Sequence, residues 1–313
     1  MLRTSGVGDS TVSVRIIAVL AGLALAAGCR SRRVDPDLGH GTVQNRARDS
    51  ASLTPVSPPP TGNRVAPSPP PRRLESREPF VPLAVPGYGD AVVGIPVGTT
   101  ERRPILVALH GNFDRPSWQC EVWRDISGGY PFVLCPRGIP RRDAPKRLDR
   151  WEWGSTEKTD GELQAAVTAL VGQYGEFVAP GPILLAGFSL GAILEVGIMK
   201  RHPGQFGPVV LVEGGHRGWT RAVAQRIFGN SNAADAGLKP QARVLFACGQ
   251  WECLKKGRSL VKLLDRSGVE AQVVHGPRAG HTYDGAVAEA IRGKWNWLTS
   301  GDERWTGSAA SID

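Results

Sequence analysis

The sequence lacks several patterns that define large classes of protein. It contains neither GxGxxG nor GxxxxGK[ST], the glycine-rich loops that bind phosphates, so no nucleotide cofactor is expected. Its cysteines and histidines show no paired CxxC or HxxxH spacing, which argues against a structural zinc site. No apolar run approaches the roughly 18 residues that a membrane-spanning helix requires. No internal repeat is visible, and a repeat architecture is therefore not predicted.

The positive charge of the chain is not concentrated on its globular part. The formal net charge is +9, and about half of it lies in the first 80 residues, outside the segment in which apolar runs recur. The surplus that remains is typical of a soluble domain, and we do not predict a nucleic-acid partner. With 41% hydrophobic residues, the chain can nevertheless bury a sizeable core.

The first 28 residues have the pattern of an export signal. Arg3 and Arg15 precede an apolar run of about 12 residues, 16–27, which suits a signal peptide. The run ends in Ala26-Ala27-Gly28-Cys29, which resembles the lipobox of bacterial lipoproteins, although the family usually has leucine at the position of Ala26. The resemblance implies cleavage after residue 28 and a lipid anchor on Cys29. A plain cleaved signal is the alternative.

Residues 29–79 are rich in proline and arginine and show neither helical nor strand periodicity. Such a segment favours extended polyproline II conformations, so we predict a disordered tether; a proline-rich recognition ligand is the alternative. Arg30, rather than aspartate, follows Cys29, which resembles the default sorting of lipoproteins to the outer membrane. The expected location is therefore the bacterial cell envelope, with the exported chain anchored in the outer membrane and exposed to the periplasm.

From residue 80 onward, short apolar runs alternate with amphipathic segments. We predict one α/β domain over residues 80–300, with a mainly parallel sheet of about eight strands and helices on both faces, followed by a flexible tail, 301–313. The clearest predicted strands are 91–97, 105–110, 132–135, 183–186, 209–212, 244–248 and 271–275, and the clearest helices are 162–174, 192–200, 259–266 and 286–298.

Four cysteines remain once Cys29 is assigned to lipid, and they lie in a compartment that permits disulfides. Four cysteines allow three connectivities. Because short separations lower the entropy of loop closure, we favour Cys120 with Cys135 and Cys248 with Cys253.

The strongest chemical motif is a GxSxG sequence, Gly187-Phe188-Ser189-Leu190-Gly191, between an apolar strand and a helical segment. Small residues flank the serine because the strand-to-helix turn is too tight for larger ones. This context predicts that Ser189 is a nucleophile standing above the sheet at a helix N-terminus, where exposed amides favour developing negative charge.

Here residues 80–298 resemble the α/β-hydrolase superfamily of serine hydrolases, in particular esterases and dienelactone hydrolases. His110-Gly111-Asn112 looks like the turn after the third strand of that family, which implies an oxyanion hole made by the backbone amides of Asn112 and Leu190. The family order of serine, acid and histidine makes His281, in Ala279-Gly280-His281-Thr282, the expected general base. For His110 we expect a structural role.

The sequence leaves the acid of the triad open. Gly249-Gln250-Trp251-Glu252 resembles the family's GxxD turn, with glutamate in place of aspartate, so Glu252 is the first choice. Glu213 ends the preceding strand, where some family members place the acid, and is the alternative. Asp284, or no functional acid, is the remaining option.

These residues predict an enzyme that cleaves an ester or thioester of a small acyl substrate through an acyl-enzyme on Ser189, with no cofactor and no metal. The interval 213–242 is short, so a minimal cap or none is expected. Peptidase or acyltransferase activity on the same triad is the nearest alternative, and a non-catalytic binding protein on this scaffold is the rival from another class. The basic stretch 137–150 is either a solvated loop or an attractor of acidic substrates and anionic surfaces.

Overall fold

A computed structural model describes residues 72–229 and 243–308 of the chain. They belong to one compact unit, Pro67–Asp313. The predicted signal peptide, Cys29 and most of the tether lie outside the described residues. Within those residues no helix is both long and apolar enough to cross a membrane.

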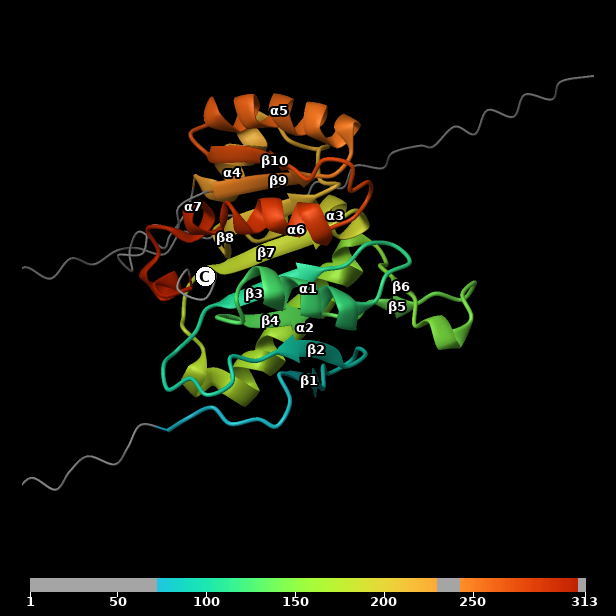
Figure 1. The fold of residues 1–313 in the computed structure, drawn as a ribbon, viewed down its shortest axis with the longest axis vertical. Helices are drawn as coiled ribbons and strands as arrows, with labels where there is room; N and C mark the ends of the chain where they lie inside the picture. The colour runs from blue at the N-terminus through green and yellow to red at the C-terminus, as the bar shows by residue number, and fades with distance from the viewer. Residues whose placement is uncertain (1–71, 230–242, 309–313) are drawn as a thin grey trace, which may run out of the picture. The chain divides into compact units, whose positions relative to one another are not determined.

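An eight-stranded sheet forms the centre of the domain (Figure 1). Its strand order is β1-β2-β4-β3-β7-β8-β9-β10, and every pairing from β4 to β10 is parallel, whereas β2 is antiparallel to both neighbours. The strands are β1 (Phe80–Leu83), β2 (Ala91–Gly94), β3 (Ile105–Leu109), β4 (Phe132–Cys135), β7 (Ile183–Phe188), β8 (Phe206–Val212), β9 (Arg243–Cys248) and β10 (Glu270–His275). The predicted α/β class and mainly parallel sheet are confirmed.

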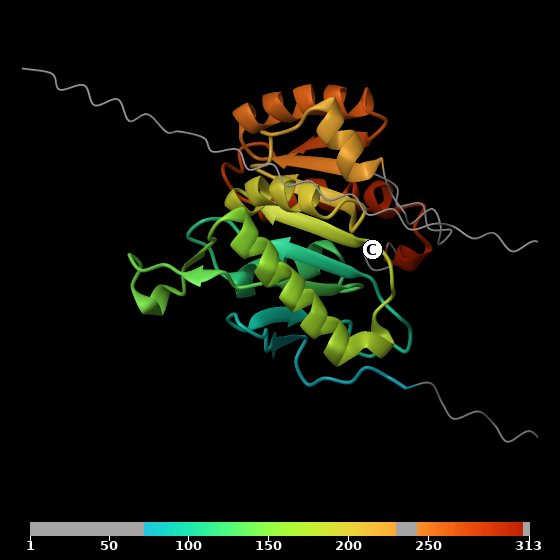
Figure 2. The ribbon, with the colours of Figure 1, turned by 180° about the vertical axis from the view of Figure 1, so that it is seen from behind.

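Helices cover both faces of the sheet (Figures 1 and 2). One face carries α1 (Pro116–Ile126), α6 (Gly285–Arg292) and α7 (Trp295–Thr299); the other carries α2 (Thr156–Tyr174), α3 (Leu190–Arg201), α4 (Arg221–Phe228) and α5 (Trp251–Asp265). Strand β3 shows why the central strands are continuously apolar. Ile105, Val107 and Leu109 enter one core, and Leu106 and Ala108 enter the other.

A two-stranded hairpin projects from the carboxyl edge of the sheet (Figures 1 and 2). It consists of β5 (Ile139–Pro140) and β6 (Trp151–Glu152), with the short helix η1 (Lys146–Leu148) between them. The basic stretch 137–150 of the sequence lies largely within it. Backbone hydrogen bonds between Asp114 and Trp151 join the hairpin to the loop after β3.

The folded domain extends beyond the predicted range, 80–300, at both ends. Leu74, which precedes residue 80, is 6% exposed and belongs to the core. After residue 300, the turn η4 (Glu303–Trp305) places Trp305, 3% exposed, edge-on against Trp295. A flexible tail from residue 301 is therefore wrong for residues 301–308, and residues 309–313 lie outside the described part.

Some elements differ from those predicted. The helix expected over 286–298 is two helices, α6 and α7, because the chain turns at Gly293 and Lys294. Strand β1 and helices α1 and α4 were not predicted. Each is short, so its pattern of apolar and polar residues extends over too few positions to be recognised. The short helix η2 (Gly175–Phe177) follows α2.

Both favoured disulfides are present. Cys120 in α1 is bonded to Cys135 at the end of β4, and Cys248 at the end of β9 is bonded to Cys253 in the first turn of α5. The first bridge ties a helix to the sheet. The second closes a short ring around the turn between β9 and α5.

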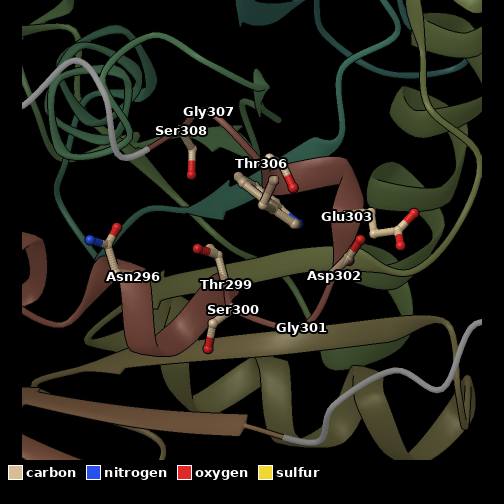
Figure 3. A pocket seen from close by; sticks show the side chains of 10 residues that line it. Asn296, Thr299, Ser300, Gly301, Asp302, Glu303, Thr306, Gly307 and Ser308 are labelled. Carbon is tan, nitrogen blue, oxygen red and sulfur yellow. The ribbon is translucent and has the colours of Figure 1, made fainter.

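The segment around α7 and η4 surrounds a cavity of about 410 Å³ (Figure 3). Its lining includes Asn296, Thr299, Asp302 and Thr306. Arg304 donates to the carbonyl of Pro182, which directly precedes β7. The cavity therefore lies near the amino end of β7, away from the edge at which Ser189 is found.

Candidate active site

Ser189 occupies a sharp turn between β7 and α3. Its backbone has φ 51° and ψ −109°, a conformation that non-glycine residues rarely adopt. The flanking glycines are required by space: a Cβ on Gly191 would lie 2.1 Å from the carbonyl oxygen of Leu109, and one on Gly187 would lie 2.7 Å from the amide nitrogen of Ala192. The strained turn presents the Ser189 hydroxyl at the carboxyl edge of the sheet.

His281 faces Ser189 from the loop between β10 and α6. Its Nε2 lies 2.9 Å from Ser189 Oγ, within hydrogen-bond distance. The ring packs against Phe188, with ring centres 4.9 Å apart, and Phe188 in turn contacts Tyr283. The imidazole is therefore held against the strand that carries the serine, in the arrangement that a general base requires.

Glu213 lies behind His281. Glu213 Oε2 is 3.3 Å from His281 Nδ1, and Oε1 accepts hydrogen bonds from the amides of Gly249 at 2.6 Å and Gln250 at 2.8 Å. The side chain is 1% exposed. Glu213 has φ 51°, a second strained non-glycine residue at the same edge. This carboxylate thus has both oxygens engaged, and one of them orients the imidazole.

The first choice for the acid, Glu252, is corrected by the structure. Helix α5 begins at Trp251, so Glu252 lies in its first turn, with the carboxylate exposed and paired with Lys255. That ion pair holds the pKa of the Glu252 carboxyl below its usual range. The carboxylate that His281 contacts is the alternative, Glu213. Asp284, the remaining option, accepts a hydrogen bond from Thr282 and precedes α6.

The backbone amides of Asn112 and Leu190 lie in the two loops expected to form an oxyanion hole. Neither donates a hydrogen bond to protein atoms within the described residues. Leu190 is the first residue of α3, directly after Ser189. Gly111 brings the other loop close, because a Cβ there would lie 3.5 Å from the Cβ of Ser189. The amide of Leu190 thus adjoins the serine, and the loop that carries Asn112 passes beside it.

The loop after β3 is held by residues that the sequence analysis treated only in part. His110 is fully buried and stacks on Trp153, with ring centres 4.4 Å apart, and its ring nitrogens lie within 2.8 Å of the carbonyls of Gly111 and Arg137. Burial lowers the pKa of His110. This agrees with the structural role predicted for it. The carboxylate of Asp114, which was not predicted, accepts from the amide of Arg115 and contacts that of Gly111 at 3.4 Å.

A cavity of about 630 Å³ adjoins the acid. Its lining includes Glu213, His216, Arg217, Lys256 and Ile193. His216 therefore lines a hollow beside the triad; burial, followed by the charge of Lys256, lowers its pKa. Trp219 is buried against Phe228, whereas Trp251 is exposed.

One group of residues has the composition of a metal site. Ligand atoms of His216, Cys248 and Cys253 lie within 4.8 Å of one another. Both sulfurs, however, are joined in a disulfide, which leaves neither as a thiolate, the form that binds a metal. In this oxidised form the group offers a single imidazole.

Glu195, on the helix that follows Ser189, is fully buried, and its carboxylate oxygens have no hydrogen-bond partner among the described residues. Burial raises its pKa well above the usual value of 4.5. The folded protein therefore keeps a proton that the unfolded chain loses, and the free energy of unfolding should fall as pH rises above about 4.5.

Glu195→Gln should remove this contribution. We expect the free energy of unfolding of the variant minus that of wild type to increase with pH, by up to about 1.4 kcal/mol per pH unit. Urea unfolding at pH 5 and pH 8 measures this difference. Glu289→Gln, which changes an exposed glutamate, should follow wild type at both pH values. A constant difference between Glu195→Gln and wild type would show that Glu195 is ionised in the folded state.

The fold and the site together define a class. A mainly parallel eight-stranded sheet, with the GxSxG serine on the turn from β7 to α3 and a histidine from a late loop against it, is the α/β-hydrolase fold, and the predicted fold is confirmed.

No family model and no curated protein matches the sequence. Several solved structures resemble the chain. A putative dienelactone hydrolase from Klebsiella pneumoniae is 15% identical, with a TM-score of 0.49, over 71% of this chain and 98% of that one. Fluorophosphonate-binding serine hydrolase F from Staphylococcus aureus is 16% identical, with a TM-score of 0.46, over 71% of this chain and 97% of that one. An uncharacterised Bacillus cereus protein is 12% identical, with a TM-score of 0.49, over 64% of this chain; this chain spans 61% of its length.

Proposed function

We propose that the protein is a serine hydrolase that cleaves a carboxylic ester or thioester through an acyl-enzyme on Ser189. The observation that carries the proposal is the continuous chain of contacts from Ser189 Oγ to His281 Nε2 and from His281 Nδ1 to the buried carboxylate of Glu213. Each member has the chemical group that its role needs: a hydroxyl, an imidazole and a carboxylate.

In the first half-reaction, Ser189 Oγ attacks the carbonyl carbon of the substrate while His281 Nε2 accepts the hydroxyl proton. Glu213 orients the imidazole and stabilises the imidazolium that forms. The amides of Asn112 and Leu190 bind the oxyanion of the tetrahedral intermediate. One such donor typically contributes about 10² to 10³ in rate. His281 then protonates the departing alkoxide or thiolate, and the acyl group remains on Ser189.

In the second half-reaction, water attacks the acyl-enzyme and gives a proton to His281. The intermediate collapses, the carboxylic acid leaves, and His281 returns the proton to Ser189 Oγ. The balanced reaction converts one ester and one water into an acid and an alcohol. Ser189 is partly exposed and His281 is exposed at the carboxyl edge, so a substrate can reach them, and the cavity lined by Glu213 lies beside the acid.

The proposal includes export and anchoring. Residues 16–27 would direct the chain across the inner membrane, Cys29 would carry lipid, and residues 30–71 would separate the domain from the bilayer. These steps rest on the sequence motifs alone.

A fluorophosphonate probe tests the reaction, because it forms a covalent bond only with an activated serine. We expect labelling of the wild-type chain and loss of labelling in Ser189→Ala. Ser300→Ala, which changes an exposed serine beside the cavity at the amino end of β7, should label like wild type. The proposal fails if wild type is unlabelled or if Ser189→Ala is labelled normally.

A further inference from the structure

The hairpin beside the active site carries cations that the fold does not use. Arg142, Lys146 and Arg147 are exposed, and none of them pairs with a carboxylate within residues 72–229 and 243–308. They lie within six residues of one another on the segment between β5 and β6. Their charges are therefore presented together to the surroundings.

The acids of the hairpin do not neutralise these cations. Asp143 and Glu152 both pair with Arg141, whose guanidinium is thereby fixed against the hairpin. Asp149 accepts a hydrogen bond from the indole of Trp151. Residues 139–152 contain five cations and three acids, so the net charge of the segment is +2.

Apolar side chains are exposed on the same structure. Ile139 on β5 is 48% exposed and Leu148 in η1 is 39% exposed. Phe113, at the base of the hairpin, is 43% exposed, with the guanidiniums of Arg141 and Arg150 over its ring at 5.5 Å and 5.4 Å. Large apolar side chains set among cations are typical of surfaces that lie at a lipid interface, where the chains enter the headgroup region and the cations meet phosphates.

The hairpin is fixed to the loop that flanks the nucleophile. Trp151 N donates to the carbonyl of Asp114 at 3.0 Å, and Arg141 donates to the side chain of Asn112 at 2.8 Å. Gly111, one residue earlier, lies against Ser189. Whatever the hairpin binds is therefore held beside the serine.

We propose that the hairpin, residues 139–152 together with Phe113, docks on a bilayer surface that carries anionic lipid headgroups. A soluble polyanion would use the cations alone, whereas a bilayer also accommodates Ile139, Leu148 and Phe113. Docking would bring esters at the bilayer surface to Ser189; this last consequence rests on the proposed hydrolase function, whereas docking itself does not.

Vesicle binding tests the proposal. The test uses a chain that begins at residue 67, because the whole sheet and both apolar cores lie within residues 72–308 and the apolar run 16–27 would itself bind lipid. Near-ultraviolet circular dichroism verifies that each variant is folded. Binding is measured by sedimentation with vesicles of phosphatidylcholine, with and without 30% phosphatidylglycerol.

We expect binding only to the anionic vesicles. Arg142→Ser/Lys146→Ser/Arg147→Ser should weaken binding about 100-fold, since each basic residue near an anionic surface contributes about fivefold. Arg102→Ser/Lys262→Ser/Arg266→Ser removes three exposed cations elsewhere and should change binding less than threefold. Ile139→Ser/Leu148→Ser should weaken binding about tenfold, and Val97→Ser/Val171→Ser, at sites of similar exposure, should not.

Three results would overturn the assignment. The first is that the wild-type chain binds both vesicle types equally, or binds neither. The second is that the two charge-removal variants behave alike. The third is that the hairpin binds soluble polyglutamate but not vesicles. The last result would identify a polyanion site in place of a membrane surface. None of these outcomes bears on fluorophosphonate labelling of Ser189, so failure of docking is distinguishable from failure of the hydrolase function.

Discussion

Glu213→Gln should lower kcat for ester hydrolysis by about 10⁴, the size of the loss seen when the acid of such triads is neutralised or removed. The geometry gives a specific reason. The amides of Gly249 and Gln250 point at Oε1 and would select the carbonyl oxygen of the glutamine. Its NH₂ group would then face His281 Nδ1 and force the proton of the ring onto Nε2. An imidazole in that tautomer cannot accept the proton of Ser189.

Glu252→Gln is the matched control. It makes the same chemical change on an exposed glutamate of α5 that pairs with Lys255, and we expect kcat within twofold of wild type. Both variants are assayed with p-nitrophenyl butyrate at pH 8. A large loss in Glu252→Gln, or a loss below tenfold in Glu213→Gln, would contradict the assignment of Glu213.

Gly191→Ala should lower the free energy of unfolding by about 3 kcal/mol, the upper end of the range for overpacking a dense core. The added Cβ would lie 2.1 Å from the carbonyl oxygen of Leu109 and 2.8 Å from that of His110. Both are backbone atoms, so no side-chain rotation relieves the contact. The turn that holds Ser189 would have to move away from β3, and kcat should fall with it.

Gly172→Ala provides the opposite case. Gly172 lies in α2 with nothing within 4 Å of the added methyl group, so the variant should be more stable than wild type by about 0.5–1 kcal/mol. Urea unfolding measures both changes. Equal stability of Gly191→Ala and wild type would show that the turn does not pack against β3 as described.

Much of the fold could be predicted because its signals are local. The apolar runs of β3, β7 and β9 are buried on both sides, so they stand out from the amphipathic helices. Ser189 was recognisable because the glycines around it are a direct requirement of the turn. Among the elements that were missed, β1 and the two strands of the hairpin have only two to four residues each, and α4 has eight.

The acid could not be predicted with the same security. The choice between Glu213 and Glu252 depends on where α5 begins. The predicted helix starts at residue 259, whereas α5 starts at Trp251, which makes Glu252 a solvent-facing helix position instead of a loop residue. It also depends on backbone amides, which leave no trace in side-chain patterns: Gly249 and Gln250 hold Glu213 through their N–H groups. A glutamate directly after a buried strand and before two glycines, as in Glu213-Gly214-Gly215, was the available signal.

The bridge between Cys248 and Cys253 has a further consequence for handling the protein. The ring that it closes contains Gly249 and Gln250, the donors that fix Glu213, so the position of the triad acid is secured by a covalent bond as well as by packing. Material folded in a reducing host would carry an unaltered sequence without that ring. Two preparations that differ only in this bridge have the same mass once they are reduced, yet they can differ in specific activity. Free thiols should therefore be titrated alongside every rate measurement.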